Sequence, residues 1–133
     1  MSEIGDRSGS AAETKVLYIE DNHSNIQLMQ DIFDEFLPYR LISAGTAEKG
    51  IELAKQEQPD LILMDINLDG MNGYQALEII RADSEIAVIP VFAISADVIP
   101  QQPDASTEKG FDAYISKPFD LADLIKRLKQ RLG

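Results

Sequence analysis

Residues 61–70 read LILMDINLDG, four apolar residues followed by Asp65 and a short stretch that ends at Gly70. A short, continuous apolar run of this kind is typical of a strand in a parallel sheet, because such strands are covered on both faces. The carboxylate that follows the run indicates a strand that delivers a polar side chain to the edge of the sheet, where open α/β folds bind their ligands.

The segment DINLDG at 65–70 also matches the first half of the calcium loop of EF-hand proteins. With Asp65 as position 1 of such a loop, Ala76 occupies position 12, where calcium binding requires a bidentate Glu. The segment before Asp65 has the pattern of a strand, whereas an EF-hand loop follows a helix. The sequence therefore disfavours a calcium loop.

Four other short apolar runs alternate with amphipathic stretches along the chain. The runs are VLYI at 16–19, RLISA at 40–44, VFAIS at 91–95 and AYIS at 113–116. Strands that alternate with helices predict an α/β fold, a five-stranded doubly wound parallel sheet with strand order 2-1-3-4-5 and helices on both faces. In such a sheet the ligand site lies beyond the carboxyl ends of the first and third strands.

Apolar residues at helical spacing predict helices between these strands. The first stripe consists of Ile26, Met29, Ile32, Phe33 and Phe36, and the second of Ile51 and Ala54 behind a Thr46 cap. The third consists of Tyr74, Leu77 and Ile80. The last consists of Leu121, Leu124, Ile125, Leu128 and Leu132 behind an Asp120 cap, with Asp123 in the first turn. A further helix is expected between Ala96 and Gly110. Pro103 would cost about 3 kcal/mol in a helix interior, so we expect this helix to be short or to begin late.

The composition indicates one acidic globular domain. The chain has 133 residues, a net charge of −11 and a pI near 4.4, which disfavours binding to nucleic acids and anionic membranes. Residues 1–14 are polar and rich in Gly, Ser and Ala, so we expect a flexible tail there and a single domain over 15–133. The absence of Cys and of a signal-peptide pattern predicts a cytoplasmic protein, and His23, the only histidine, leaves no multi-histidine metal site.

Polar side chains follow the carboxyl ends of the predicted strands: Glu20, Asp21, Asp65, Ser95 and Lys117. Two carboxylates about 4 Å apart repel by roughly 4 kcal/mol at an effective dielectric constant near 20, so three of them need a cation. Carboxylate and carbonyl oxygens suit a hard ion, and Mg²⁺ or Mn²⁺ fits best a site that keeps open positions. A metal beside a carboxylate, a hydroxyl and an ammonium group predicts phosphoryl transfer, with Asp65 as the nucleophile that forms an acyl phosphate.

Over residues 15–133 the chain resembles the receiver domain of response regulators in two-component signalling. The segments that carry the resemblance are VLYIEDN at 16–22, PDLILMDINLDGMNGYQAL at 59–77, VFAISA at 91–96 and GFDAYISKPF at 110–119. The resemblance implies a signalling switch and no turnover of other substrates. Asp65 would accept a phosphoryl group from a histidine kinase or a histidine phosphotransfer protein, with Mg²⁺, and the domain would then change the surface read by an output partner. We expect a monomer or weak dimer, similar to stand-alone receivers and to the C-terminal receivers of hybrid histidine kinases.

The resemblance also implies a set of metal ligands. Glu20, Asp21 and Asp65 would hold Mg²⁺, Asp21 more directly and Glu20 often through water. The backbone carbonyl of Asn67 would complete the metal shell, and the Asn67 side chain would tune dephosphorylation. The family commonly has Pro at the position of Asp69, so this chain carries one more negative charge near the metal loop. That charge is expected either to strengthen cation binding or to slow the approach of a phosphodonor.

A second set of residues is implied to respond to phosphorylation. The Ser95 hydroxyl and the Lys117 ammonium group would pair with the phosphoryl oxygens, and the small side chain of Ala96 would leave room for them. Tyr114 matches the aromatic residue that turns inward when Ser95 moves. The peptide bond between Lys117 and Pro118 is expected to be cis.

Three other functions fit parts of the same pattern. A phosphatase of the haloacid-dehalogenase type also uses a strand-end Asp and Mg²⁺, but it wants a second Asp at the position of Asn67 and a cap domain. A flavin-binding module shares the sheet topology, but the loop EDNHSN at 20–25 is acidic where a flavin phosphate requires an anion nest. A receiver fold that acts as an interaction module without phosphorylation is the third.

Overall fold

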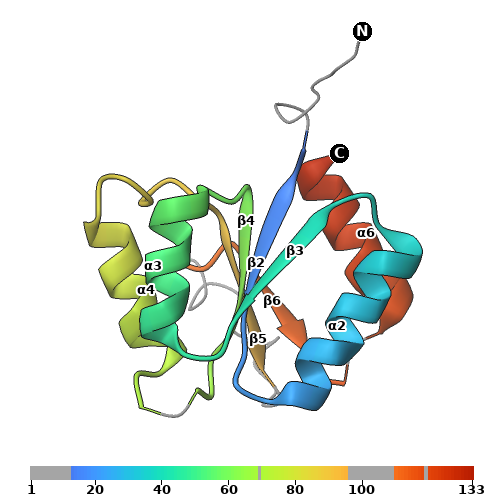
Figure 1. Ribbon diagram of the computed structural model, residues 1–133, viewed down its shortest axis with the longest axis horizontal. Helices are drawn as coiled ribbons and strands as arrows, with labels where there is room; N and C mark the ends of the chain where they lie inside the picture. The colour runs from blue at the N-terminus through green and yellow to red at the C-terminus, as the bar shows by residue number, and fades with distance from the viewer. Residues whose placement is uncertain (1–12, 69, 96–109, 119) are drawn as a thin grey trace, which may run out of the picture.

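A single parallel sheet lies at the centre of the molecule. The computed structural model describes residues 13–68, 70–95, 110–118 and 120–133. The strands are β2 (Lys15–Ile19), β3 (Arg40–Ala44), β4 (Leu61–Asp65), β5 (Val91–Ser95) and β6 (Ala113–Ser116). All neighbouring strands are parallel and their order across the sheet is β3-β2-β4-β5-β6 (Figure 1). Counted along the chain this is the order 2-1-3-4-5, so the predicted fold is confirmed.

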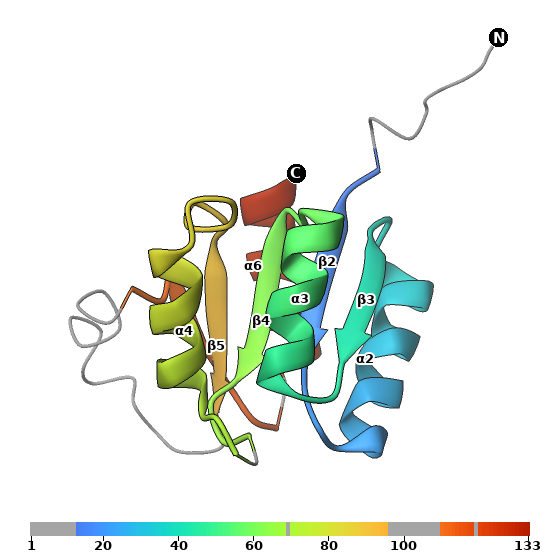
Figure 2. The same ribbon diagram turned by 60° about the vertical axis from the view of Figure 1, so that its left-hand side comes forward.

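Helices cover both faces of the sheet. They are α2 (His23–Phe36), α3 (Ala47–Glu57), α4 (Gly73–Ala82) and α6 (Leu121–Leu132). Helices α3 and α4 pack against one face, and α2 and α6 pack against the other (Figures 1 and 2). The helix expected between Ala96 and Gly110 and the tail expected over 1–14 lie outside the described residues, except for Glu13, Thr14 and Gly110. Within the described parts of the chain, no helix has the length and apolar character that crossing a membrane requires.

Each described helix begins at a polar cap residue. The caps are Asn22, Thr46, Asn72 and Asp120, and in each case the side chain accepts a hydrogen bond from a backbone N–H in the first turn. Such caps satisfy donors that the helix leaves unpaired and typically contribute about 1 kcal/mol each. The predicted caps at Thr46 and Asp120 are confirmed. The Asn22 cap is important for the site, because it starts α2 directly after the polar residues that follow β2.

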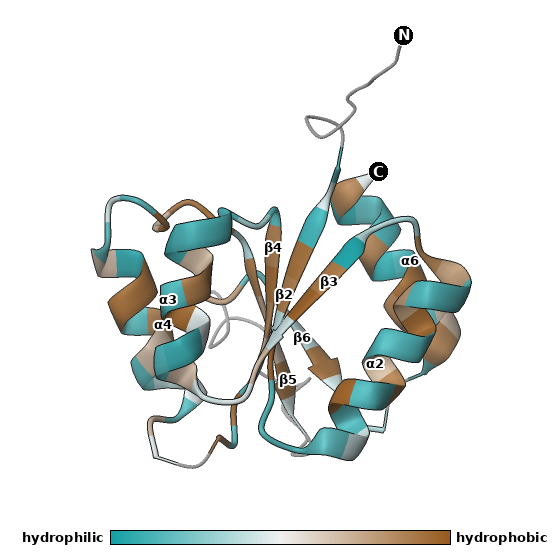
Figure 3. Ribbon diagram, viewed as in Figure 1, coloured by the Kyte–Doolittle hydropathy of each residue, from teal (hydrophilic) through white to brown (hydrophobic). Residues whose placement is uncertain are grey.

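The core consists of two apolar layers, one on each side of the sheet. Every residue of β4 and β5 is buried, whereas the edge strands β3 and β6 are only partly buried. Brown apolar colouring therefore runs through the central strands, and the helices carry teal residues on their outer faces (Figure 3). Two fully buried central strands fix the position of the residues at and directly after their carboxyl ends, since a shift by one residue would move each side chain to the opposite face.

Two apolar residues that the spacing assigned to buried stripes are exposed. Phe36 has 47% of its surface exposed and Leu121 has 39%. The prediction was wrong for both residues, and both stand at a helix end, Phe36 as the last residue of α2 and Leu121 as the first of α6. Helical spacing identifies the face on which a residue lies but not whether the helix end still lies over the sheet.

Candidate metal site at the carboxyl ends of the strands

Three carboxylates meet where β2 and β4 end. Asp65 is the last residue of β4, and Glu20 and Asp21 directly follow Ile19, the last residue of the neighbouring β2. One oxygen from each of these three carboxylates lies within 4.8 Å of the other two. Glu20 is 1% exposed and Asp65 is 4% exposed, whereas Asp21 is open to solvent. The topology thus brings Asp65 together with Asp21 and Glu20, which lie 44 and 45 positions earlier in the chain (65 minus 21 and 65 minus 20).

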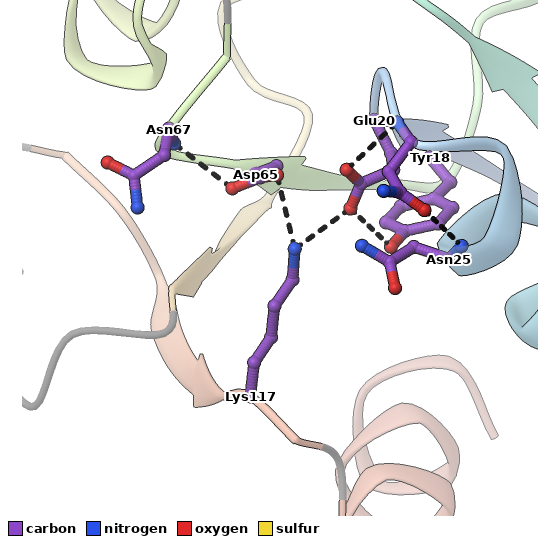
Figure 4. Close-up of polar contacts among 7 residues, drawn as sticks. Tyr18, Glu20, Asn25, Asp65, Asn67 and Lys117 are labelled. Carbon is purple, nitrogen blue, oxygen red and sulfur yellow. Dashed lines mark hydrogen bonds and ion pairs between the residues drawn. The ribbon is translucent and has the colours of Figure 1, made fainter.

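Lys117 supplies the positive charge that these buried carboxylates need. Its Nζ atom lies 3.0 Å from Glu20 Oε1 and 3.1 Å from Asp65 Oδ2, so one ammonium group bridges the ends of two strands (Figure 4). Lys117 follows β6, and its backbone N–H donates to the carbonyl oxygen of Ser95 at 2.9 Å. The peptide bond between Lys117 and Pro118 is cis. Because β6 pairs with β5 and β5 pairs with β4, the ammonium group reaches the acids from the far side of β5.

Tyr18 also belongs to this group, although the sequence had not singled it out as a site residue. Its hydroxyl donates to Glu20 Oε1 at 2.8 Å, and the backbone N–H of Asn22 donates to Glu20 Oε2 at 3.3 Å (Figure 4). Two signals could have revealed it. Residues two apart on a strand share a face, and a buried tyrosine hydroxyl usually finds a partner, so Tyr18 within an aliphatic run points along the strand to Glu20.

The loop after β4 is held close to the phosphoacceptor candidate. The backbone N–H of Asn67 donates to Asp65 Oδ1 at 3.0 Å, and the N–H of Gly73 donates to the carbonyl oxygen of Ile66 at 3.0 Å. A Cβ atom on Gly73 would lie 2.8 Å from Ile66 Cα, so only glycine allows this approach. Both oxygens of Asp65 thus have a hydrogen-bond donor, while Asp69 lies outside the described residues.

The electrostatics of the two buried carboxylates differ. Burial raises the pKa of Asp65, and the hydrogen bond from Asn67 only partly offsets it. Burial also acts to raise the pKa of Glu20, but hydrogen bonds from Lys117 and Tyr18 together outweigh it and leave that pKa below its ordinary value. Burial and the neighbouring Glu20 carboxylate raise the pKa of the Tyr18 hydroxyl, which therefore keeps its proton. Glu20 is the firmly ionised member of the pair.

The donor atoms at this site fit a small hard cation. The side chains that converge offer carboxylate oxygens, and their separation within 4.8 Å lets one ion contact all three groups. Hard oxygen donors favour Mg²⁺ or Mn²⁺ over softer transition metals. A divalent ion here would neutralise charge that burial makes costly, in addition to the one charge of Lys117.

The remaining residues expected at the site lie on β5 and β6. Ser95 is buried at the end of β5, one residue beyond Ile94, whose Cα pairs with Asp65 in the sheet. Ala96 lies outside the described residues. Tyr114 is half-buried on β6 and turns toward α4, where its hydroxyl lies 3.0 Å from the hydroxyl of Tyr74.

An aromatic cluster surrounds the Tyr114 ring. The ring centroids of Phe111 and Tyr114 are 5.8 Å apart, and those of Phe111 and Tyr74 are 5.5 Å apart in an edge-on arrangement. Burial and the Tyr74 hydroxyl raise the pKa of Tyr114, so the Tyr114 hydroxyl keeps its proton. Helical spacing places Tyr74 on an apolar stripe and does not reveal its bond with Tyr114.

The arrangement of acids, lysine and strand order matches a known family. A model of the response regulator receiver domain matches residues 16–129. The chain belongs to the response regulator receiver domains. This receiver domain is 34% identical over 118 residues to the polar-differentiation response regulator DivK of Brucella ovis, a match that covers 89% of this chain and 95% of DivK.

Solved receiver structures superimpose closely on this one. The receiver domain of the sensor histidine kinase PA1611 from Pseudomonas aeruginosa is 28% identical, with a TM-score of 0.80 over 92% of this chain and 99% of that chain. Its crystal structure has a magnesium ion coordinated in the active site cleft. The chemotaxis response regulator CheY4 of Vibrio cholerae, at 23% identity, has a TM-score of 0.80 over 92% of this chain and 100% of that chain, which supports the fold.

Proposed function

We propose that this receiver domain is a phosphorelay switch in which Asp65 accepts a phosphoryl group from a phosphohistidine, with Mg²⁺ bound by the acidic cluster. The phosphodonor would be a histidine kinase or a histidine phosphotransfer protein, and the reaction would take place in the cytoplasm. The observation that carries the proposal is the convergence of Glu20, Asp21 and Asp65 within 4.8 Å, with Lys117 bonded to two of them.

The chemistry is a transfer from nitrogen to oxygen. A carboxylate oxygen of Asp65 attacks the phosphorus atom, the bond between phosphorus and the donor histidine breaks, and the imidazole keeps the electron pair and later takes up a proton. The product is an acyl phosphate. When bound, Mg²⁺ neutralises charge on the phosphoryl oxygens. Glu20, Asp21, Asp65 and the backbone carbonyl of Asn67 would hold it.

The protein's own groups would position the reacting carboxylate. Asp65 accepts hydrogen bonds from the Asn67 N–H at 3.0 Å and from the Lys117 ammonium group at 3.1 Å. These bonds would fix the rotation of the Asp65 carboxylate before the phosphodonor arrives. After transfer, the Lys117 ammonium group would pair with phosphoryl oxygens, and the Ser95 hydroxyl would turn toward them, with Ala96 leaving room. Tyr114 would then change position and alter the surface that an output partner contacts.

Labelling with acetyl phosphate tests the proposal directly. The wild type should form one phosphorylated species that requires Mg²⁺, disappears with EDTA and is cleaved by hydroxylamine, as expected of an acyl phosphate. Asp65→Asn should reduce the labelling at least about 100-fold, because the attacking oxygen is gone. Phosphate incorporation can be followed by intact mass and by a shift in phosphate-affinity gels.

The matched control is Asp83→Asn, which changes an aspartate that pairs with Lys55 at 2.8 Å, between α3 and α4. It should label like the wild type. Equal, Mg²⁺-dependent labelling of wild type and Asp65→Asn would disprove the proposed acceptor. Absence of any labelling in the wild type, with acetyl phosphate and with phosphorylated kinases, would favour an interaction module instead. Turnover of a general phosphatase substrate would favour the haloacid-dehalogenase alternative.

A further inference from the structure

We propose that a pocket between α6 and the first residues of β5 and β6 binds a small aromatic ligand that carries a phosphate monoester. The pocket has a volume of about 280 Å³ and is lined by Phe92, Asp112, Ala113, Arg127, Gln130 and Arg131. Binding here goes beyond the proposed phosphoryl transfer to Asp65 and does not require it.

The pocket lies at the opposite end of the sheet from the acidic cluster. Phe92 is the second residue of β5 and Ala113 is the first of β6, whereas Asp65 is the last residue of β4. In Figure 1 the strand arrows point away from the end of α6 that lies beside the mark C. The pocket is therefore a second site, separate from the one expected at the carboxyl ends of the strands.

Positive charge is concentrated on the helix that forms one wall of the pocket. The chain as a whole has 12 basic and 23 acidic residues, but residues 124–133 include four basic residues and no acidic one. Arg127, Gln130 and Arg131 lie three and four positions apart, so they share one face of α6. Two like charges one helical turn apart repel each other, and a bound anion would relieve this repulsion.

The side chain of Arg127 is oriented by an ion pair that leaves most of its donors available. Its Nε atom donates to Asp123 Oδ2 at 2.8 Å, one turn earlier on α6. This bond restricts a long side chain and uses Nε, so both Nη groups can donate to a ligand. The Asp123 side chain is 48% exposed, so solvent screens its negative charge.

Asp112, the acidic residue of the pocket wall, is balanced by another arginine. Its Oδ2 atom accepts from the backbone N–H of Val91 at 2.8 Å and from Arg81 Nη2 at 3.2 Å. Arg81 belongs to α4, which packs on the other face of the sheet. Arg127 and Arg131 therefore leave the pocket attractive to an anion.

The chemistry of the wall favours an aromatic phosphate ester. One guanidinium group can satisfy both oxygens of a carboxylate, whereas a phosphate monoester offers three oxygens and a charge of about −1.5 to −2 to two arginines. Phe92 and Ala113 add apolar surface against which a flat ring can pack. Pockets for drug-sized ligands begin at roughly 300 Å³, so a ligand with a single ring suits this one.

Titration of ¹⁵N-labelled protein with phenyl phosphate tests the proposal. EDTA is present throughout, so the ligand cannot bind through a metal ion at the acidic cluster. We expect saturable shifts of the amide resonances of Ala113 and residues 127–131, and nuclear Overhauser effects between the phenyl protons and the Ala113 methyl group. Asp65→Asn should bind equally well, which separates this site from the proposed phosphoacceptor. Absence of saturable shifts at these residues with millimolar ligand overturns the inference.

Arg131→Gln and Arg40→Gln form a matched pair. Both replace an exposed arginine and change the net charge equally, but Arg40 lies on β3, at the opposite edge of the sheet. Arg131→Gln should weaken binding of phenyl phosphate about 10-fold, because charged hydrogen bonds are lost, and Arg127→Gln should do the same. Arg40→Gln should stay within about twofold of wild type at physiological ionic strength. Equal weakening by Arg40→Gln would mean unspecific attraction and would overturn the inference.

Two further probes test the class of ligand. Inorganic phosphate should bind more weakly than phenyl phosphate, because it lacks the ring that packs against Phe92 and Ala113. Benzoate should also bind more weakly, because its carboxylate cannot engage both arginines fully. Equal affinity for inorganic phosphate would overturn the assignment of an aromatic ligand, and equal affinity for benzoate would overturn the assignment of a phosphate ester.

Discussion

Two tyrosine hydroxyls, on opposite faces of the sheet, are bonded in very different ways. Tyr18 lies under α2 and α6 and donates to Glu20, a carboxylate that also binds Lys117. Tyr114 lies on the face covered by α3 and α4, and its hydroxyl bonds to another hydroxyl, that of Tyr74. The first tyrosine is completely buried, whereas the second is half-buried in an aromatic cluster.

The difference indicates which part of the molecule is held rigidly and which part can change position more easily. Hydrogen bonds to charged groups typically contribute about 1.5–3 kcal/mol, while those between neutral groups contribute about 0.5–1.5 kcal/mol. The network around Glu20 and Asp65 therefore holds the site in one geometry. The bond between Tyr74 and Tyr114 can be exchanged for water at small cost, which suits a residue that is proposed to change position.

Removal of Lys117 should reduce the free energy of unfolding more than the other substitutions below. Lys117→Met leaves Glu20 and Asp65 buried without their cation, so we expect a loss of about 3 kcal/mol in the free energy of unfolding, measured by urea titration in EDTA. Added Mg²⁺ should recover part of the loss, because a divalent ion supplies the missing charge. Acetyl phosphate labelling should fall as well.

Lys55→Met is the control for the lysine prediction. Lys55 pairs with Asp83 at 2.8 Å, and its side chain is 46% exposed, so solvent screens the pair and removing it should change stability little. If Lys117→Met were as stable as Lys55→Met in EDTA, the network around Glu20 would not be the rigid part of the molecule.

The carboxylate of Asp65, the candidate phosphoacceptor, should lower the stability of the folded state at neutral pH. Burial raises the pKa of Asp65, so the native state holds its proton more tightly than the unfolded state. The stability associated with the protonated group is present below the unfolded pKa and is lost as pH rises through the native pKa. In EDTA at pH 7, Asp65→Asn should therefore melt at a temperature higher by about 3 °C, and the gain should shrink toward pH 3.5.

Asp83→Asn should show the opposite sign. The Lys55 ammonium group lowers the pKa of Asp83, so its contribution to stability is present at neutral pH and is lost as pH falls through the native pKa. Its removal should lower the melting temperature slightly at pH 7 and have no effect at low pH. An Asp65→Asn curve parallel to that of Asp83→Asn would contradict the prediction that the buried Asp65 carboxylate lowers stability at neutral pH.

The sequence predicted the acidic cluster because topology alone produces it. Parallel strands end at the same edge of a sheet, so polar residues after β2 and β4 must meet, however far apart they lie in the chain. Tyr18 was missed for a physical reason. Its ring belongs to the apolar core, and the spacing of apolar residues indicates that the ring is buried but does not indicate which group its hydroxyl bonds to. The bond between Tyr74 and Tyr114 joins residues 40 positions apart and depends on the rotamers of both, which no local pattern encodes.

Breaking the tyrosine pair should have the smallest effect. In Tyr74→Phe the ring contact with Phe111 remains and the bond to the Tyr114 hydroxyl is lost, so we expect a loss of about 0.5–1 kcal/mol in the free energy of unfolding. Tyr114→Phe should cost a similar amount, because it breaks the same bond. Urea titration of the two single variants and the double variant measures this directly.

The double variant decides whether the pair acts as one interaction. If the two hydroxyls matter through each other, Tyr74→Phe with Tyr114→Phe should be no less stable than either single variant, since the bond can be lost only once. Costs that add would mean that each hydroxyl has an independent partner. With additive costs, Tyr114 would be held as firmly as Tyr18, and the contrast between a fixed site and an exchangeable switch residue would no longer hold. Labelling of Asp65 should stay within about twofold of wild type in both single variants, because neither hydroxyl belongs to the network around Glu20.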